Sequence, residues 1–115
     1  MILSSLILGG AAVVAGVGLI AKFWNTIVSW LHRVYDKLRT VIQGVLEGTK
    51  IFFKKMGEAA KEISKNYSRV GTKWKETIAE KSIQASEIPE EYRNRMKKDY
   101  QEYEFSDELE MQLQQ

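Results

Sequence analysis

The sequence predicts an all-α membrane protein: one N-terminal transmembrane helix continues into a long amphipathic, oligomerising helix, and a short extended or β segment and C-terminal helices follow. Three observations predict this fold class. Residues 2–21 carry no charge, apolar residues then recur in steps of three and four, and positive charge gathers between residues 22 and 75. The chain divides accordingly into segments 1–24, 25–70, 71–88 and 89–115.

The first segment has the length of a transmembrane helix. A helix that rises about 1.5 Å per residue needs about twenty apolar residues to cross a hydrocarbon layer. Phe23 and Trp24 follow the run at the place where aromatic side chains favour the membrane interface. No basic residue precedes Ile2, which argues against a cleaved secretory signal. A buried helix in a soluble core is the alternative.

Small residues recur four positions apart within this span, and they indicate a helix that packs closely against other helices. Self-association into a homo-oligomer is therefore expected, with a simple lipid anchor as the alternative. A second pair of glycines follows outside the span. The expected helix-packing residues are Gly9, Ala12, Gly16, Gly44 and Gly48.

The second segment has the periodicity of helices that pack along a seam. From Ile27 onward, apolar residues follow at alternating steps of four and three for about six heptads, with two positions of the repeat, Gly48 and Asn66, not apolar. The series is Ile27, Leu31, Val34, Leu38, Val41, Val45, Phe52, Met56, Ala59, Ile63 and Val70. Gly71 is expected to end this helix in the left-handed conformation. A stripe this wide predicts an assembly of more than two chains or contact with a membrane surface.

In a bundle of such helices, polar residues would face the pore. Ser4 and Ser5 lie near the outer end of the expected span, and Asn25, Ser29 and His32 form a polar strip at its inner mouth. These five residues are the pore-lining candidates.

Charge is segregated along the chain. Residues 22–75 hold twelve Lys or Arg and four Asp or Glu, whereas residues 76–115 hold five and eleven. This asymmetry favours an anionic partner for the first part, either lipid headgroups or a polyanionic ligand. An ordinary solvated helix face with an acidic tail is the alternative. The candidates for contact with phosphate are Lys50, Lys54, Lys61, Lys65, Arg69, Arg93 and Arg95.

The last two segments differ from the helix that precedes them. Polar and apolar residues alternate from Thr72 to Ile78, which favours a short strand or extended ribbon over 71–88, with helix as the alternative. Pro89 suits the first position of a helix in 89–115. Tyr92 and Met96 share a face of that helix with later tyrosines, among Arg93 and Arg95. Such a face packs in a core more often than it stacks on bases.

Enzymatic chemistry is not expected. The chain has no cysteine and one histidine, His32, so a zinc site built on Cys or a site with two imidazoles is excluded. No glycine-rich loop follows a strand to hold phosphate, and no serine stands out beside His32 as an activated nucleophile. We therefore expect no metal and no cofactor.

One stretch resembles small membrane proteins of bacterial antiphage defence operons, specifically the channel component of Hailong-type systems. It is EGTKIFFKKMGEAAKEISKNYSRVGTKWKETIAEKSIQASEIPEE, residues 47–91, with the apolar run ahead of it and ELEMQLQ behind. The resemblance implies a homo-oligomeric ion channel in the inner membrane. Nucleotide oligomers from a partner nucleotidyltransferase would hold it shut, and loss of the inhibitor would depolarise the cell.

The expected function is therefore a channel or pore subunit in the bacterial inner membrane, with its C-terminus in the cytoplasm as the positive-inside rule predicts. Its expected partners are the lipid bilayer, further copies of the chain and an anionic nucleotide or oligonucleotide. Two alternatives stay open. One is a membrane-anchored scaffold or binding module without conduction, and the other is a holin-like permeabilising toxin.

Overall fold

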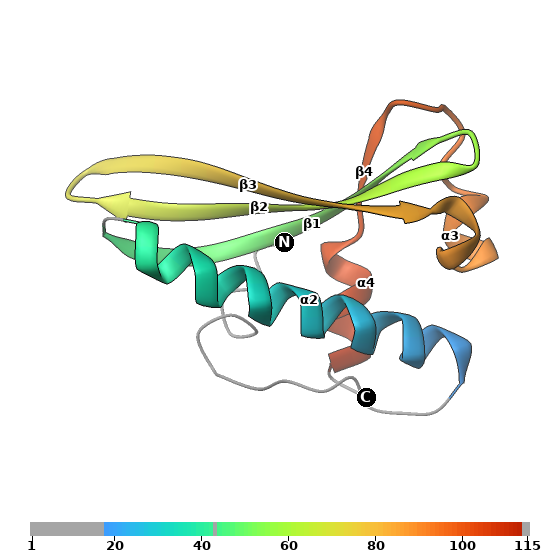
Figure 1. The fold of residues 1–115 in the computed structure, drawn as a ribbon, viewed down its shortest axis with the longest axis horizontal. Helices are drawn as coiled ribbons and strands as arrows, with labels where there is room; N and C mark the ends of the chain where they lie inside the picture. Colours follow the sequence, from blue (N-terminus) through green and yellow to red (C-terminus); the bar gives the residue numbers. More distant parts are fainter. Residues whose placement is uncertain (1–17, 43, 114–115) are drawn as a thin grey trace.

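The structure is a computed structural model that describes residues 18–42 and 44–113. Three long strands follow one long helix, and short helices and a short strand complete the chain (Figure 1). In chain order the elements are α2 (Leu19–Val41), β1 (Val45–Met56), β2 (Ala59–Val70), β3 (Lys73–Gln84), the 3-10 helix η1 (Ala85–Glu87), α3 (Glu90–Arg93), β4 (Glu102–Glu104) and α4 (Ser106–Leu113).

The strands form one antiparallel sheet in the order β3-β2-β1-β4. The three long strands have 12 residues each and are joined by two tight hairpins. Gly57 and Gly71 open the hairpin turns with φ angles of +68° and +64°. Turns of two residues match the twist of a hairpin when they take positive φ, a conformation that glycine adopts without a steric penalty.

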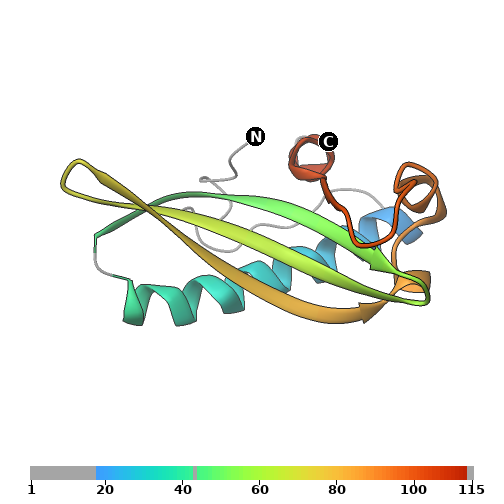
Figure 2. The same cartoon turned by 90° about the horizontal axis from the view of Figure 1, so that it is seen from above.

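Helix α2 crosses one face of the sheet, and α4 lies on the same side (Figures 1 and 2). The buried side chains of α2 recur at helical spacing, which gives this helix one apolar side. We call the sheet face beneath α2 the inner face and the opposite one the outer face. The buried residues of α2 are Ala21, Trp24, Ile27, Val28, Trp30, Leu31, Val34 and Leu38.

An aromatic cluster joins the N-terminal half of α2 to the sheet and to the C-terminal segments. Trp24, Phe53, Tyr92 and Phe105 lie with neighbouring ring centroids 5.2–6.0 Å apart, and Phe23 packs on Phe53 at 5.5 Å. The Trp24 indole Nε1–H donates a hydrogen bond of 2.9 Å to the Tyr92 hydroxyl. Edge-on and tilted ring pairs of this kind add to the free energy of burial.

The connection from α2 to β1 depends on Gly44. Its φ of +105° is unfavourable for other residues, and a Cβ at this position would collide with the backbone carbonyl oxygen of Arg69. Glycine is therefore needed at position 44 because the backbone of β2 at Arg69 packs directly against it. Gly48, its expected partner in helix packing, is a buried residue of β1 beside a register shift in the β1–β2 ladder.

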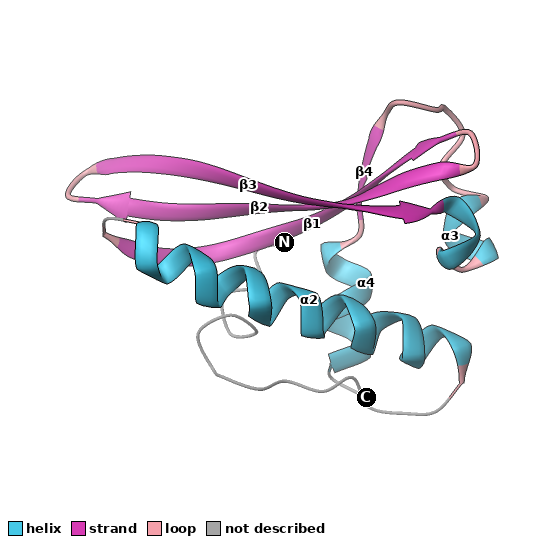
Figure 3. Ribbon diagram, in the orientation of Figure 1, coloured by secondary structure: helices cyan, strands magenta, loops and turns pink. Residues whose placement is uncertain are grey.

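The all-α fold class predicted from the sequence is wrong, because residues 45–84 form three antiparallel strands (Figure 3). The expected long helix over 25–70 ends at Val41. Within α2 the seam residues Ile27, Leu31, Val34 and Leu38 are buried together as a helix requires. Beyond α2, side chains alternate between two faces, so the seven-residue repeat no longer gathers its members on one side.

The expectation of a transmembrane channel is also contradicted. Within residues 18–42 and 44–113, no helix is both long enough and apolar enough to cross a membrane. The sequence of α2 includes Leu19–Ala21, the end of the expected span, but this helix packs on the sheet through Trp24 and Leu31. Residues 2–17 of that span lie outside the described residues.

Candidate functional site

The outer face carries most of the cations proposed from the sequence. Alternation along β1 places Lys50 and Lys54 on this face, and alternation along β2 adds Lys61, Lys65 and Arg69. A spacing of four residues keeps side chains on one face of a strand as well as of a helix. The structure places these five residues on one face, but on a sheet and not on the expected helix.

Four of these lysines form two like-charged pairs across the two central strands. Lys50 lies directly opposite Lys65, and Lys54 lies directly opposite Lys61. Two of the four also contact glutamates of the outer strands, since Lys61 Nζ lies 3.2 Å from Glu80 and Lys65 Nζ lies 2.7 Å from a Glu102 oxygen. Like charges directly opposite one another destabilise a sheet, so this arrangement has a cost in stability.

Three aromatic rings accompany the cations on the outer face. Lys65 Nζ lies 4.5 Å from the ring centroid of Phe52. The other two rings have a cation at 5.9 Å, where Lys50 lies over Tyr67 and Arg69 lies over Trp74. Trp74 is 61% exposed. Flat rings alternating with cations are the arrangement with which proteins stack bases and hold phosphates.

Carboxylates border this basic centre. Five glutamates lie on the outer strands and at the register shift of β1, and they equal the five cations in number. The outer face is therefore a positive strip between acidic margins, and its net charge is near zero. The glutamates are Glu47, Glu76, Glu80, Glu102 and Glu104.

Arg93 and Arg95, the other two proposed cations, lie apart from the outer-face lysines. The Arg93 Nε–H donates to the carbonyl oxygen of Ile88 at 2.9 Å. Arg95 lies over the Phe105 ring at 4.7 Å and forms an ion pair of 2.7 Å with Glu108. Both side chains secure the C-terminal segments, so the seven proposed cations do not form one site.

Among the described residues, the structure brings together only three of the pore-lining and helix-packing candidates, on one side of α2. Asn25, Ser29 and His32 lie on α2 outside its buried set, with Ser29 exposed. The candidates Ser4, Ser5, Gly9, Ala12 and Gly16 lie outside the described residues. Gly44 and Gly48 do not pack one helix against another as expected, because Gly44 lies in the connection before β1 and Gly48 lies within β1.

A polar seam on the inner face was missed by the sequence analysis. Thr49 Oγ1–H donates to Asn66 Oδ1 at 2.7 Å, and Asn66 Nδ2 donates to the Thr77 carbonyl at 3.0 Å and to Ser64. Asn66, Thr49 and Ser64 are fully buried, and Ser68 continues the seam. Alternation in Glu62, Ser64, Asn66 and Ser68 is the sequence signal, but small polar residues rarely line a buried face.

Glu62 is the buried acid of this inner face. Its side chain is 3% exposed, and its Oε2 atom has no hydrogen-bond partner within the described part of the chain. Burial raises the pKa of Glu62 from 4.5 to about 7, and the nearby positive charges of Lys81 and Arg33 only partly oppose this. A buried carboxyl that titrates near neutrality beside a cavity is a recognised mark of a functional position.

Metal binding has no support in the described ranges, where no group of three or more acidic or histidine side chains could hold an ion. Comparison of the chain with protein families, curated proteins and solved structures gives no match. The resemblance to Hailong-type channel components therefore stays a hypothesis. The outer face and the surroundings of Glu62 are the two features of the molecule that point to a function.

Proposed function

We propose that this protein is a binding module that recognises a short anionic ligand, a nucleotide or short oligonucleotide, through the outer face of its sheet. The observation that carries the proposal is the pair of like-charged contacts, Lys50 opposite Lys65 and Lys54 opposite Lys61. Repulsion between these ammonium groups is relieved when a phosphate lies between them. Binding of an anionic ligand would therefore remove the unfavourable repulsion between the paired lysines, and this would contribute to the free energy of binding.

The aromatic residues supply the second part of the proposed recognition. Phe52, Tyr67 and Trp74 lie on the two central strands and on β3, each with a cation over its ring. A base that stacks on one of these rings would displace the cation toward the adjoining phosphate. Base–aromatic stacking contributes about 1–3 kcal/mol per base, enough to add to a modest electrostatic attraction.

The acidic margins set the size of the ligand. Glu76 and Glu80 on β3 and Glu102 and Glu104 on β4 would repel a long polyanion that crossed the strands. A ligand with a few phosphates fits the positive strip along β1 and β2. This points to a short oligonucleotide rather than to a duplex or a long single strand.

The proposal concerns recognition by the described residues and includes neither conduction nor membrane insertion. Among the alternatives drawn from the sequence, it retains the binding module. A partner nucleotidyltransferase as the source of the ligand follows only from the resemblance and stays a prediction.

The test is fluorescence anisotropy with a fluorescein-labelled single-stranded oligonucleotide of about eight nucleotides, titrated at several salt concentrations. Lys50 and Lys54 form no ion pair within 4 Å with any other described residue, so their replacement breaks no salt bridge, although the charge of Lys50 also acts on Glu104. We expect the double variant Lys50→Gln with Lys54→Gln to lose about tenfold in affinity. The slope of log K against log salt should flatten by about 1.4, since two phosphate contacts are removed.

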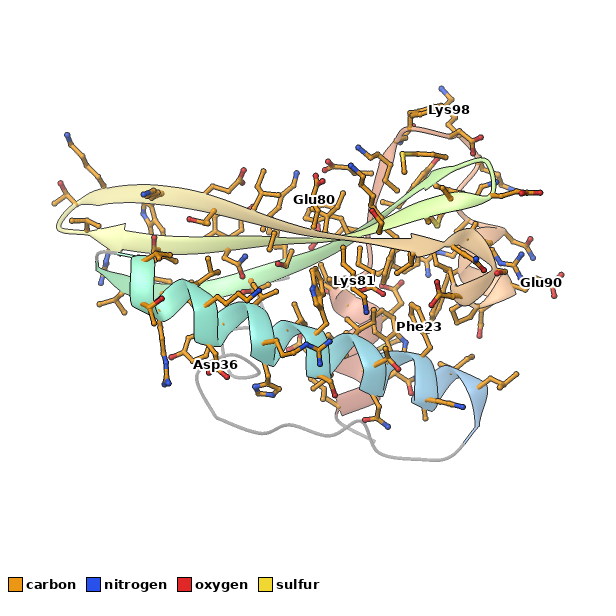
Figure 4. The ribbon with its side chains drawn as sticks, viewed as in Figure 1. Phe23, Asp36, Glu80, Lys81, Glu90 and Lys98 are labelled. Carbon is orange, nitrogen blue, oxygen red and sulfur yellow. The ribbon has the colours of Figure 1, made fainter. Side chains whose placement is uncertain are left out.

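The matched control is Lys97→Gln with Lys98→Gln, which removes two exposed lysines from the loop before β4 (Figure 4). This variant should bind as the unmodified protein does. Equal losses in both double variants would mean that net charge alone attracts the oligonucleotide, and the proposed face would be wrong. Absence of binding by the unmodified protein at low salt would also overturn the proposal.

A further inference from the structure

A cavity opens beside the N-terminal half of α2, on the side of the sheet opposite the basic strip. Its volume is about 890 Å³. Glu62 of β2 lines it, together with the segment that runs from η1 into α3. The remaining lining residues are Gly18, Leu19, Ile20, Lys22, Phe23, Thr26, Ser86, Glu87, Ile88, Pro89, Glu90, Glu91 and Arg93.

Glu62 is the buried polar group of this cavity. The register places it between Phe53 on β1 and Lys81 on β3, under α2. Figure 4 shows Lys81 and Phe23 in the space between the sheet and this helix. No ion pair within 4 Å joins Lys81 to Glu62 in the described residues, and the Glu62 Oε2 atom has no hydrogen-bond donor. A buried carboxyl oxygen without a donor is costly, and a ligand cation would remove that cost.

The charged groups at the rim favour a cation. Glu87, Glu90 and Glu91 belong to the lining, against Lys22 and Arg93. Arg93 already donates its Nε–H to the Ile88 carbonyl, which holds its guanidinium against the chain. An anion in this cavity would meet four carboxyl groups of the lining, one of them buried, against Lys22 and Arg93. Lys81 and Arg33 also act on Glu62, but they lie outside the lining and only partly offset the effect of its burial. The lining itself therefore favours positive charge.

The walls of the cavity are apolar. Phe23, Leu19 and Ile20 of α2 lie on one side, and Ile88 and Pro89 lie on the other. A metal ion would need several oxygen ligands close together, and no such group is present in the described residues. Apolar walls above a single buried carboxyl suit an organic cation with a hydrocarbon part.

We propose that this cavity binds an organic ammonium ion, with the ammonium group at the Glu62 carboxylate and its hydrocarbon chain between Phe23 and Ile88. The site is separate from the outer face and does not depend on the proposed oligonucleotide binding. Its ligand class is a primary amine on a short alkyl chain.

Binding should be linked to protonation. The ammonium ion requires an ionised Glu62, whose pKa of about 7 leaves it mostly protonated at pH 6 and mostly ionised at pH 8. The groups that face it are Lys81 from β3, Arg33 from α2 and Glu87 from η1. Because only the ionised fraction binds, affinity should rise about tenfold between pH 6 and pH 8, with release of a proton at the lower pH.

The experiment is isothermal titration calorimetry of the full chain with n-hexylamine, at pH 6 and pH 8 and in two buffers of different ionisation enthalpy. Proton release at pH 6, tighter binding at pH 8 and no binding of hexanoate are the expected results. Hexanoate has the same alkyl length with the opposite charge. Binding of hexanoate in preference to n-hexylamine, or no heat from n-hexylamine at millimolar concentration, would overturn the proposal.

The variant Glu62→Gln keeps the side-chain shape and removes the charge, so it should lose at least tenfold in affinity for n-hexylamine and all of the pH dependence. The control Glu58→Gln changes an exposed acid in the β1–β2 turn, outside the cavity lining, and should change neither. Unaltered binding in Glu62→Gln would refute the site. The proton release measured on the unmodified protein tests the same point without any substitution.

Discussion

The two ends of the inner face of the sheet are held together by different chemistry, although the same helix covers both. At one end, Trp24, Phe53 and Phe105 fill the space between α2 and the sheet with aromatic rings. Toward the other end, Asn66 and Thr49 form a hydrogen-bonded polar seam. Aromatic rings stabilise the fold through the apolar surface that they bury, and this contribution tolerates small shifts in position. A buried polar seam stabilises the fold only while its polar atoms keep their hydrogen-bond partners.

The aromatic end should show the largest effect of a single substitution. Phe53 is fully buried and touches Phe23, Trp24 and Phe105. Phe53→Ala should lower the free energy of unfolding by about 3–5 kcal/mol, because burial is lost and a cavity is left. Urea unfolding monitored by tryptophan fluorescence measures the change. A loss below about 1 kcal/mol would mean that the cluster does not hold α2 on the sheet.

Glu62 lies directly opposite Phe53, at the aromatic end of the inner face, and it should make stability depend on pH. Its folded-state pKa of about 7 exceeds the ordinary value of 4.5, so the folded protein holds the proton more tightly than the unfolded chain. The stabilisation is complete below about pH 4.5 and is lost as the pH rises to 7. The contribution is about 3 kcal/mol, from 1.36 kcal/mol per pKa unit.

Urea unfolding between pH 5 and pH 8 checks this contribution. Other titrating groups contribute to the same curve, so the comparison is with Glu62→Gln, which should flatten the curve by the amount that Glu62 supplies. Parallel curves for the two proteins would show that Glu62 has an ordinary pKa.

The polar seam should show a smaller effect. Asn66→Ala removes hydrogen bonds to Thr49, Ser64 and the Thr77 carbonyl, and it leaves buried polar atoms without partners. We expect a loss of about 1–3 kcal/mol in the free energy of unfolding. Asn66→Ala combined with Thr49→Val should cost less than the sum of the two single changes, since the partner atom is removed as well. Additive losses would show that the seam is not a coupled network.

The sequence predicted the helical conformation of residues 27–38, but it predicted neither the end of α2 at Val41 nor the strands that follow. A step of three or four residues over Ile27, Leu31, Val34 and Leu38 specifies a helix, and these residues are buried on α2. The outer-face lysines form two pairs with a step of four, Lys50 with Lys54 and Lys61 with Lys65, and a step of four fits a helix and a strand equally. The better signals were Gly57 and Gly71, each opening a two-residue hairpin turn between alternating segments. The left-handed conformation expected for Gly71 is present, in a hairpin turn instead of a helix end.

The candidate sites were predictable to different degrees. The outer-face lysines were grouped from their spacing, but the glutamates beside them were not, because strand pairing brings Glu80 and Glu102 there from distant parts of the sequence. In the sequence, Glu62 lies between Lys61 and Lys65, a pattern that is typical of an exposed residue. Its burial depends on α2 lying across β2, which no local pattern in 59–70 records.

The cation–aromatic contacts of the outer face give the protein an intrinsic optical reporter. Arg69 lies 5.9 Å from the Trp74 ring, and that indole is exposed, whereas Trp24 and Trp30 are buried residues of α2. An added quencher such as iodide would therefore reach Trp74 first. A ligand that stacks on the hairpin would shield that emission and leave the two buried tryptophans unchanged, so occupancy of the face can be followed without any label.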